Sequence, residues 1–137
     1  MDKQAGVITP LNPPELPTPV GYSQVVEVQA QRLVFIAGQI AVNREGEVVG
    51  RNDFAVQAEQ VFRNLAAALQ AAGCTAGHLV KLTVFVRDMG NIAAYREARA
   101  RFFATVTPPA APAVTLVEVS RLYSPDLMIE VEAIAAL

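Results

Sequence analysis

The sequence predicts an α+β protein in which two helices cover one face of a mixed β-sheet, a two-layer sandwich of order β-β-α-β-α-β-β. Two observations predict this fold. Residues 54–72 and 92–104 repeat apolar side chains at the three-and-four spacing of a helix, whereas the segments around them alternate or are rich in β-branched residues, as strands are. The chain has 137 residues and is 53% hydrophobic, which is enough for one domain with a full core.

The first twenty residues hold five of the nine prolines. Proline lacks an N–H group and has a fixed φ, so it is excluded from helix interiors and central strands. We therefore expect residues 1–20 to form an extended lead-in and residues 21–137 to form a single domain. Residues 23–28 and 32–37 are strand-like and only three residues apart, which predicts a hairpin between them.

The first helix is expected to begin after Asn52 or Asp53, both good N-caps, and to end at Gly73. Residues 79–86 alternate between apolar and polar as in a strand with one face on a core, although Phe85 interrupts the polar side. A second helix is expected over residues 92–104, capped by Asn91 and ended by the prolines that follow Thr107. Two further strands, residues 113–119 and 127–135, complete the sheet.

The second helix is expected to turn apolar side chains inward and charged ones outward. The inward set is Ile92, Tyr95, Phe102 and Val106, and the mostly outward set is Arg96, Glu97, Arg99 and Arg101. Two helices cannot cover both faces of the sheet, and the uncovered face carries apolar residues such as Phe85. We therefore expect self-association to bury that face.

Composition excludes several functional classes. The net charge is −2 and the pI is near 5.4, so nucleic acid is not expected as a partner, because phosphate contacts need a basic stripe. No apolar run is long enough for a membrane span, and residues 1–4 lack the apolar core of a signal peptide. One cysteine, Cys74, and one histidine, His78, cannot form a disulfide or a structural zinc site. We expect the protein to lie in the cytoplasm. We also expect it to use no metal or cofactor.

Several segments, taken in order, resemble the RidA/YjgF family of enamine and imine deaminases, also called L-PSP-like endoribonucleases. The matching pieces run from Gly21-Tyr22 to Ile129-Glu130-Val131-Glu132 and include Phe35-Ile36-Ala37-Gly38-Gln39-Ile40, Ala71-Ala72-Gly73, residues 80–88, Phe102-Phe103 and residues 112–119. The resemblance implies a chorismate-mutase-like fold and a homotrimer with three small-molecule clefts between its subunits.

The same resemblance implies site residues, and here the sequence departs from the family. Deaminating members have an arginine that binds the substrate carboxylate where this chain has Val114, which offers neither donor nor charge. Other departures are Ala37 for a small hydroxyl residue before Gly38, Arg96 for an asparagine and Leu116 for a cysteine. Tyr22 and Glu130 are retained, and Glu130 matches the carboxylate thought to orient the attacking water.

Each candidate residue also has a structural interpretation. Glu130 is favoured for a cleft role, whereas Glu132, two positions along the same strand face, is expected to face solvent or to pair between subunits. Tyr22 either closes one wall of the cleft or only holds the lead-in. Arg96 either replaces the lost anchor or lies on a solvated helix face, which is favoured. The residues for which a structural role is favoured are Arg121, Lys81 and His78, and no chemistry is assigned to Cys74.

Two functions remain open from sequence alone. The first is a divergent hydrolase of imines or enamines, with altered substrate preference because of Val114 and with Glu130 positioning water. The alternative is a non-catalytic metabolite-binding or protein-interaction module of the same fold, which the apolar Val114, Ala37 and Leu116 favour. A ribonuclease role has little support, since the chain is acidic and has no Trp and one His.

Overall fold

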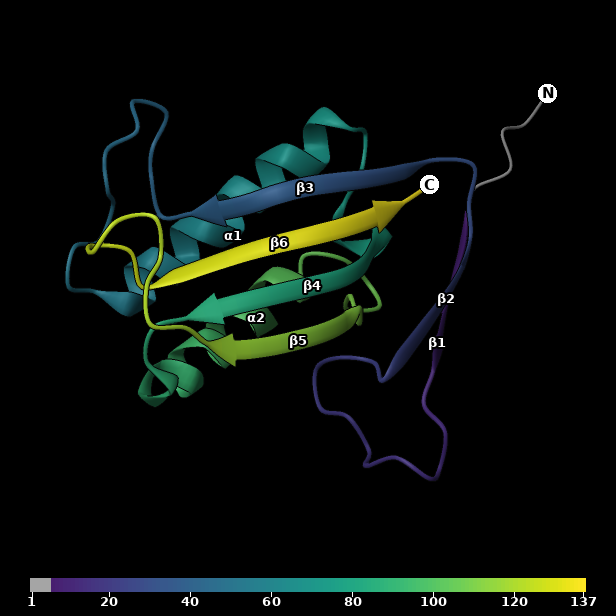
Figure 1. Cartoon of the computed structure of the whole chain (residues 1–137). Coiled ribbons are helices and arrows are strands. Elements are labelled where there is room, and N and C mark those ends of the chain that lie inside the picture. The colour runs from purple at the N-terminus through teal and green to yellow at the C-terminus, as the bar shows by residue number, and fades with distance from the viewer. Residues whose placement is uncertain (1–5) are drawn as a thin grey trace.

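The structure is a computed structural model that describes residues 6–137. The prediction that the chain starts without a signal-like segment concerns residues 1–4 and lies outside this range. Figure 1 shows a four-stranded sheet in the order β3-β6-β4-β5, with a separate ribbon of β1 and β2 beyond the ends of its strands. The strands are β1 (Val7–Leu11), β2 (Val25–Gln29), β3 (Leu33–Ile40), β4 (Leu79–Val86), β5 (Ala113–Glu118) and β6 (Ile129–Ala136).

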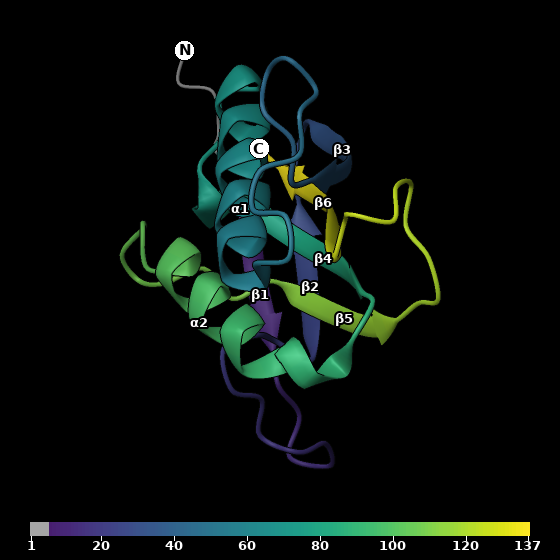
Figure 2. The same cartoon turned by 90° about the vertical axis from the view of Figure 1, so that its left-hand side faces the viewer.

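Two helices, α1 (Phe54–Ala71) and α2 (Ile92–Phe103), lie on one side of the sheet, and Figure 2 shows the two layers edge-on. This confirms the predicted two-layer α+β fold with a mixed sheet. Strand β6 runs antiparallel to both β3 and β4, whereas β5 runs parallel to β4. Within residues 6–137, neither helix combines the length and the apolar character that a bilayer crossing requires.

Helix α1 begins and ends where its local sequence predicts. The Asp53 side chain accepts a hydrogen bond from the backbone N–H of Val56, which satisfies one of the free donors at the helix start. Gly73 follows the helix with a φ of +75°, a conformation that favours glycine. Helix α2 also has its predicted bounds, but Asn91 makes no capping hydrogen bond with its side chain, so that part of the prediction is wrong.

The predicted hairpin between residues 23–28 and 32–37 is also wrong. Strand β2 pairs with β1, while β3 pairs along its length with β6 at the other end of the chain. The turn between β2 and β3 is bound to the last residue, because the backbone N–H groups of Gln31 and Arg32 both donate to the carbonyl of Leu137. The lead-in therefore contains a strand, although β1 is an outer strand and not a central one.

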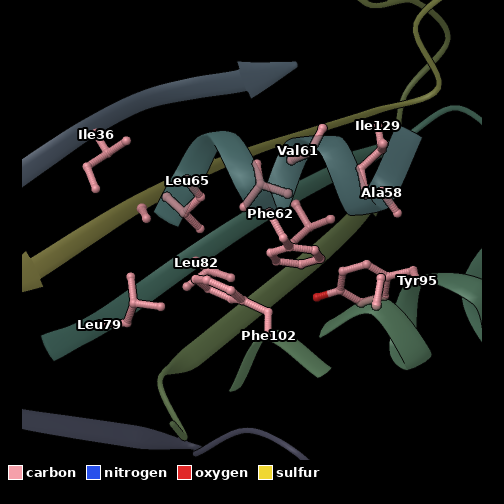
Figure 3. Packing of buried hydrophobic residues seen from close by; sticks show 14 of the residues in the cluster. Ile36, Ala58, Val61, Phe62, Leu65, Leu79, Leu82, Tyr95, Phe102 and Ile129 are labelled. Carbon is pink, nitrogen blue, oxygen red and sulfur yellow. The ribbon is translucent and has the colours of Figure 1, made fainter. Parts of the chain in front are cut away.

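The core lies between the helices and the sheet. In Figure 3, Val61 and Leu65 of α1 lie over the sheet near Leu82, while Phe62, Tyr95 and Phe102 gather between the two helices. The rings of Phe62 and Phe102 stack at 5.1 Å between centroids, which adds to the burial of apolar surface. Because both helices use this one face, the opposite face of the sheet is left open.

Candidate functional site

Glu130 lies on the open face of the sheet. Strand β6 alternates between buried residues and the more exposed Glu130, Glu132 and Ile134, and side chains two apart on a strand point the same way. On β4, Phe85 is opposite Glu130 and Thr83 is opposite Glu132. The two glutamates therefore share one face and stand close enough for their charges to interact.

Gly38 makes room for the Glu130 carboxylate. The pairing of β3 with β6 is irregular between Ile36 and Gln39, and at this bulge a Cβ atom on Gly38 would collide with the carboxylate of Glu130. Glu130 is half-buried, and burial followed by repulsion from the Glu132 charge raises its pKa. A carboxyl group with a raised pKa is suited to accept a proton from water near neutral pH.

Glu132 borders a hollow in the open face. The hollow has a volume of about 300 Å³ and its polar lining residues are Lys81, Thr83 and Glu132, set among Phe35, Ala37 and Ile134. The Lys81 ammonium donates a hydrogen bond of 2.6 Å to the hydroxyl of Thr115, which holds it over the sheet. Ala37, a predicted cleft residue, therefore lies beside Glu132 in this hollow.

Tyr22 lies in the segment that runs beside the start of β5, at the edge of the sheet. The backbone N–H of Ser23 donates to the carbonyl of Pro112 at 3.0 Å, so the chain at Tyr22 runs beside the start of β5. Tyr22 is half-buried, and its hydroxyl accepts a hydrogen bond of 3.5 Å from the side chain of Gln24. This position is compatible with either of the interpretations of Tyr22, as a cleft wall or as a support for the lead-in.

Val114 and Leu116 face away from Glu130. They pair with Leu82 and Val84 of β4, which are fully buried, and both pack against the core on the helix side. Arg96 is exposed on α2, in the layer on that same side. Within one chain, the predicted site residues therefore form two groups, one around Glu130 on the open face and one on the helix side near the β5 edge.

Among the remaining candidates, His78 and Cys74 have structural surroundings, whereas Arg121 is exposed. The backbone N–H of Thr75 donates to Nδ1 of His78 at 2.9 Å, which closes a capping box before β4. Cys74 is buried, and that burial raises the pKa of its thiol, so a reactive thiolate is disfavoured. Among residues 6–137, His, Cys, Asp and Glu side chains do not gather into a group that could hold a metal ion.

One buried charge was missed by the sequence interpretation. Arg99, expected to point outward, has only 9% of its surface exposed and lies against the rings of Tyr95 and Phe103. Its neighbours in sequence are mostly charged, which suggested a solvated face. The signal that could have found it is its spacing, four residues after the buried Tyr95 and four before Phe103, which places it on the buried side of the helix.

Comparison with known proteins identifies relatives along most of the chain. Residues 14–137 match the family model described as endoribonuclease L-PSP. A RutC family protein of Synechocystis is 40% identical over 125 residues, which cover 90% of this chain and 92% of that protein. The 2-iminobutanoate/2-iminopropanoate deaminase of Escherichia coli K12 is 41% identical over 109 residues, which cover 79% of this chain and 82% of the deaminase.

Solved structures show the same fold. The Rid family protein YyfB of Yersinia pestis has a TM-score of 0.86 at 34% identity, with 95% of this chain and 98% of YyfB covered. Escherichia coli TdcF, solved with bound serine, has a TM-score of 0.71 at 32% identity, with 94% and 98% covered. The family-model match, the identity to curated relatives and the shared fold together show that this chain belongs to the RidA/YjgF family, whose sequence model is named endoribonuclease L-PSP.

Proposed function

We propose that this protein is a hydrolase that converts imines or enamines to carbonyl compounds and ammonia, in clefts between the subunits of a homotrimer. The observation that carries this proposal is the Glu130 carboxyl group, held against Gly38 with a raised pKa on the open face of the sheet. The E. coli relative that is 41% identical is named as a deaminase of 2-iminobutanoate and 2-iminopropanoate, which supports the same reaction class here.

The reaction assigned to Glu130 is a hydrolysis. The carboxylate orients a water molecule and accepts a proton from it as the water oxygen bonds to the imine carbon. The proton then passes to the imine nitrogen, which gives a carbinolamine. The carboxylate next moves the proton of the carbinolamine hydroxyl group to the same nitrogen. The carbon–nitrogen bond then breaks, the oxygen forms the carbonyl group, and ammonia leaves. An enamine enters the same sequence after a proton moves to its carbon and converts it to the imine.

Substrate preference is proposed to differ from that of the E. coli relative. Both substrates in that relative's name carry a carboxylate beside the imine carbon, and a carboxylate is bound most strongly by a bidentate arginine. Val114 and Leu116 offer no donor from β5. An imine without a carboxylate therefore suits this cleft, unless Arg96, one helical turn before Arg99 on α2, supplies the charge from the opposite wall.

The trimer is proposed because the open face is too apolar to remain in water and because one chain leaves the site divided. Phe35 is 72% exposed and Leu33 is 59% exposed on this face. A second copy that covers it would bury both side chains. It would also bring the helix-side group of one copy, with Tyr22 and Val114, toward the Glu130 group of the next.

The alternative is a metabolite-binding or protein-interaction module without turnover. Its support is the apolar character of three predicted cleft positions, Ala37, Val114 and Leu116. TdcF, which shares the fold, has been solved with serine bound, so a family member can hold a small amino acid. Saturable binding without any product would favour this alternative.

The test is ammonia release from short-lived imines and enamines generated in place by an amino-acid oxidase or a dehydratase. The parent protein, the Val114→Arg variant and the Glu130→Gln variant are run side by side. Activity in the parent that Glu130→Gln abolishes supports the proposal, and activity only in Val114→Arg shows that the missing guanidinium limits the reaction. No activity in either, or a Glu130→Gln variant as active as the parent, contradicts the role assigned to Glu130.

A further inference from the structure

Arg99 is a buried cation without a carboxylate partner among residues 6–137. Neither of the ion pairs in that part of the chain, Arg51 with Asp126 and Arg63 with Glu59, includes it. Its guanidinium carbon lies 5.3 Å from the ring centre of Tyr95 and 6.0 Å from that of Phe103, which is cation–π range. Burial of an arginine is costly, and an apolar side chain of similar size would fill this space without that cost. The guanidinium therefore needs an explanation beyond packing.

The guanidinium reaches the lead-in at the two residues before Tyr22. Its Nη2 atom donates a hydrogen bond of 3.3 Å to the carbonyl oxygen of Val20. Gly21 has a φ of +76°, and a Cβ atom there would lie 2.8 Å from the same nitrogen. Only glycine suits both this backbone conformation and this close approach. Arg99 and Gly21 thus form one contact between α2 and the lead-in.

A second contact holds the residue after Tyr22. The backbone N–H of Ser23 donates to the carbonyl of Pro112, and the Ser23 hydroxyl donates to the carbonyl of Ala111. Tyr22 is the single residue between the contact with α2 and the contact with the segment before β5. Its backbone is therefore fixed on both sides, and this fixes the direction in which its side chain leaves the chain.

We propose that Arg99 is a positioning residue that fixes Tyr22 as a wall of the ligand cleft by holding Val20 and Gly21 against α2. This inference rests on the proposed function, because it gives Tyr22 a role toward a bound imine or enamine. Arg99 does not touch the ligand in this arrangement and acts through Tyr22. Its charge is used on the Val20 carbonyl and the two rings, so it does not replace the missing carboxylate anchor.

The first test measures the lead-in directly and needs no activity. Arg99→Met keeps the apolar stem and removes the guanidinium, Arg99→Lys keeps the charge, and Arg101→Met changes an exposed arginine on the same helix. We expect amide hydrogen exchange at residues 21–24 to be about tenfold faster in Arg99→Met and unchanged in Arg101→Met. The tyrosine ring NMR signal assigned to Tyr22 should move in Arg99→Met and return toward the parent position in Arg99→Lys.

The second test asks whether Arg99 acts through Tyr22. Ammonia release is measured for Arg99→Met, Tyr22→Phe and the double variant, in proteins that have the same far-UV circular dichroism. We expect each single change to lower kcat/KM about tenfold and the double variant to be no worse than the poorer single variant. A merely structural role would lower the amount of folded protein without this coupling.

The outcomes separate the two proposals. Unchanged exchange at residues 21–24 in Arg99→Met overturns the positioning role, as does full activity in that variant or a double variant whose loss is the product of the single losses. A parent protein that releases no ammonia contradicts the proposed function. The positioning role of Arg99 toward Tyr22 is then tested by hydrogen exchange and the NMR signal alone.

Discussion

Gly38 and Glu130 lie so close together across β3 and β6 that a methyl group on residue 38 would occupy the position of the carboxylate. The contact lies where the pairing of β3 with β6 is irregular, between Ile36 and Gln39, and an extra residue in one strand of a pair bends and twists that strand locally. The glycine therefore determines where the Glu130 side chain can lie. Gly38 has no reactive side chain, but it controls the position of Glu130, the residue to which the reaction is assigned.

Gly38→Ala should displace the Glu130 carboxylate at little cost in stability. The new methyl group would meet the flexible end of a side chain, which can rotate away, so we expect a loss of about 1 kcal/mol or less. The displaced carboxyl group becomes more solvated, and its pKa should fall toward the ordinary value. Carboxyl ¹³C NMR measures that pKa, and ammonia release should fall about tenfold or more.

Two further variants make this test specific. Gly77→Ala is the matched control, because a Cβ there would be at least 3.4 Å from its nearest neighbour and far from the sheet's open face. In a Glu130→Gln background, Gly38→Ala should cause no further loss of activity. A second loss of similar size in that background would show that Gly38 acts on something other than Glu130.

Glu130→Gln should stabilise the protein at neutral pH and not in acid. Burial and the charge of Glu132 raise the pKa of Glu130 above its ordinary value of 4.5, so the folded state prefers the protonated form. That preference contributes stability at pH values below 4.5, and the contribution is lost as pH rises through the higher folded pKa. The difference in Tm between Glu130→Gln and the parent should therefore be positive at pH 7 and shrink below pH 4.5.

Glu132→Gln provides the companion measurement. It removes one of the two causes of the shift, so the pKa of Glu130 should fall while burial keeps it above the ordinary value. If the activity depends on ionised Glu130, the acid limb of the pH profile of kcat/KM should move to lower pH in this variant. A Tm difference that grows in acid for Glu130→Gln would contradict the assigned direction of the shift.

The elements that depend on local signals were predicted correctly from the sequence. Asp53 and Gly73 bound α1 because capping and positive-φ residues act within one turn of the helix. The alternation of residues 79–86 gave β4 with its correct buried face. Predicting these features requires no information about distant parts of the chain, so the local residue types are sufficient for the prediction.

Apart from the missing side-chain cap at Asn91, the failures involve partners that are distant in sequence. The hairpin prediction could not foresee that β6 pairs with β3, because sequence proximity favours the nearer strand while the final pairing depends on the whole sheet. Arg99 was predicted to face outward because its sequence neighbours are mostly charged, and they carry no sign of its contacts with Val20 and Gly21, nearly eighty residues away. The close approach of Gly38 to Glu130 is hidden for the same reason, since it depends on a bulge in a long-range pairing.

Gln57→Ala should destabilise the protein strongly and also weaken the site. This side chain has none of its surface exposed, and it donates to the carbonyls of Gly50 and Asp126 and accepts from the N–H of Met128. The last two contacts fix the chain just before Glu130. Their loss leaves buried backbone groups unpaired, so we expect about 3 kcal/mol of destabilisation, which is a fall in Tm on the order of 10 °C.

Thermal unfolding followed by circular dichroism checks this, with Gln70→Ala as the control because Gln70 is exposed on the same helix. We expect the control to remain within about 0.5 kcal/mol of the parent. Below its Tm, the folded Gln57→Ala protein should still show reduced ammonia release. A Tm within 2 °C or so of the parent would mean that the hydrogen bonds of Gln57 are replaced by other partners.

Phe35→Asp should convert the proposed homotrimer to monomers. Phe35 is 72% exposed on the open face of the sheet, and placing a carboxylate at the centre of an apolar contact requires its desolvation without a cation to pair with it. Light scattering should give three times the chain mass of 14.6 kDa for the parent and a single chain mass for the variant. Ala67→Asp, at an exposed position of α1, should keep the parent's mass. Ammonia release should disappear together with the trimer, because Tyr22 and Val114 of one copy would no longer lie near Glu130 of the next. A monomeric parent would contradict the proposed homotrimer, and a monomeric variant that keeps full activity would show that the site is complete within one chain.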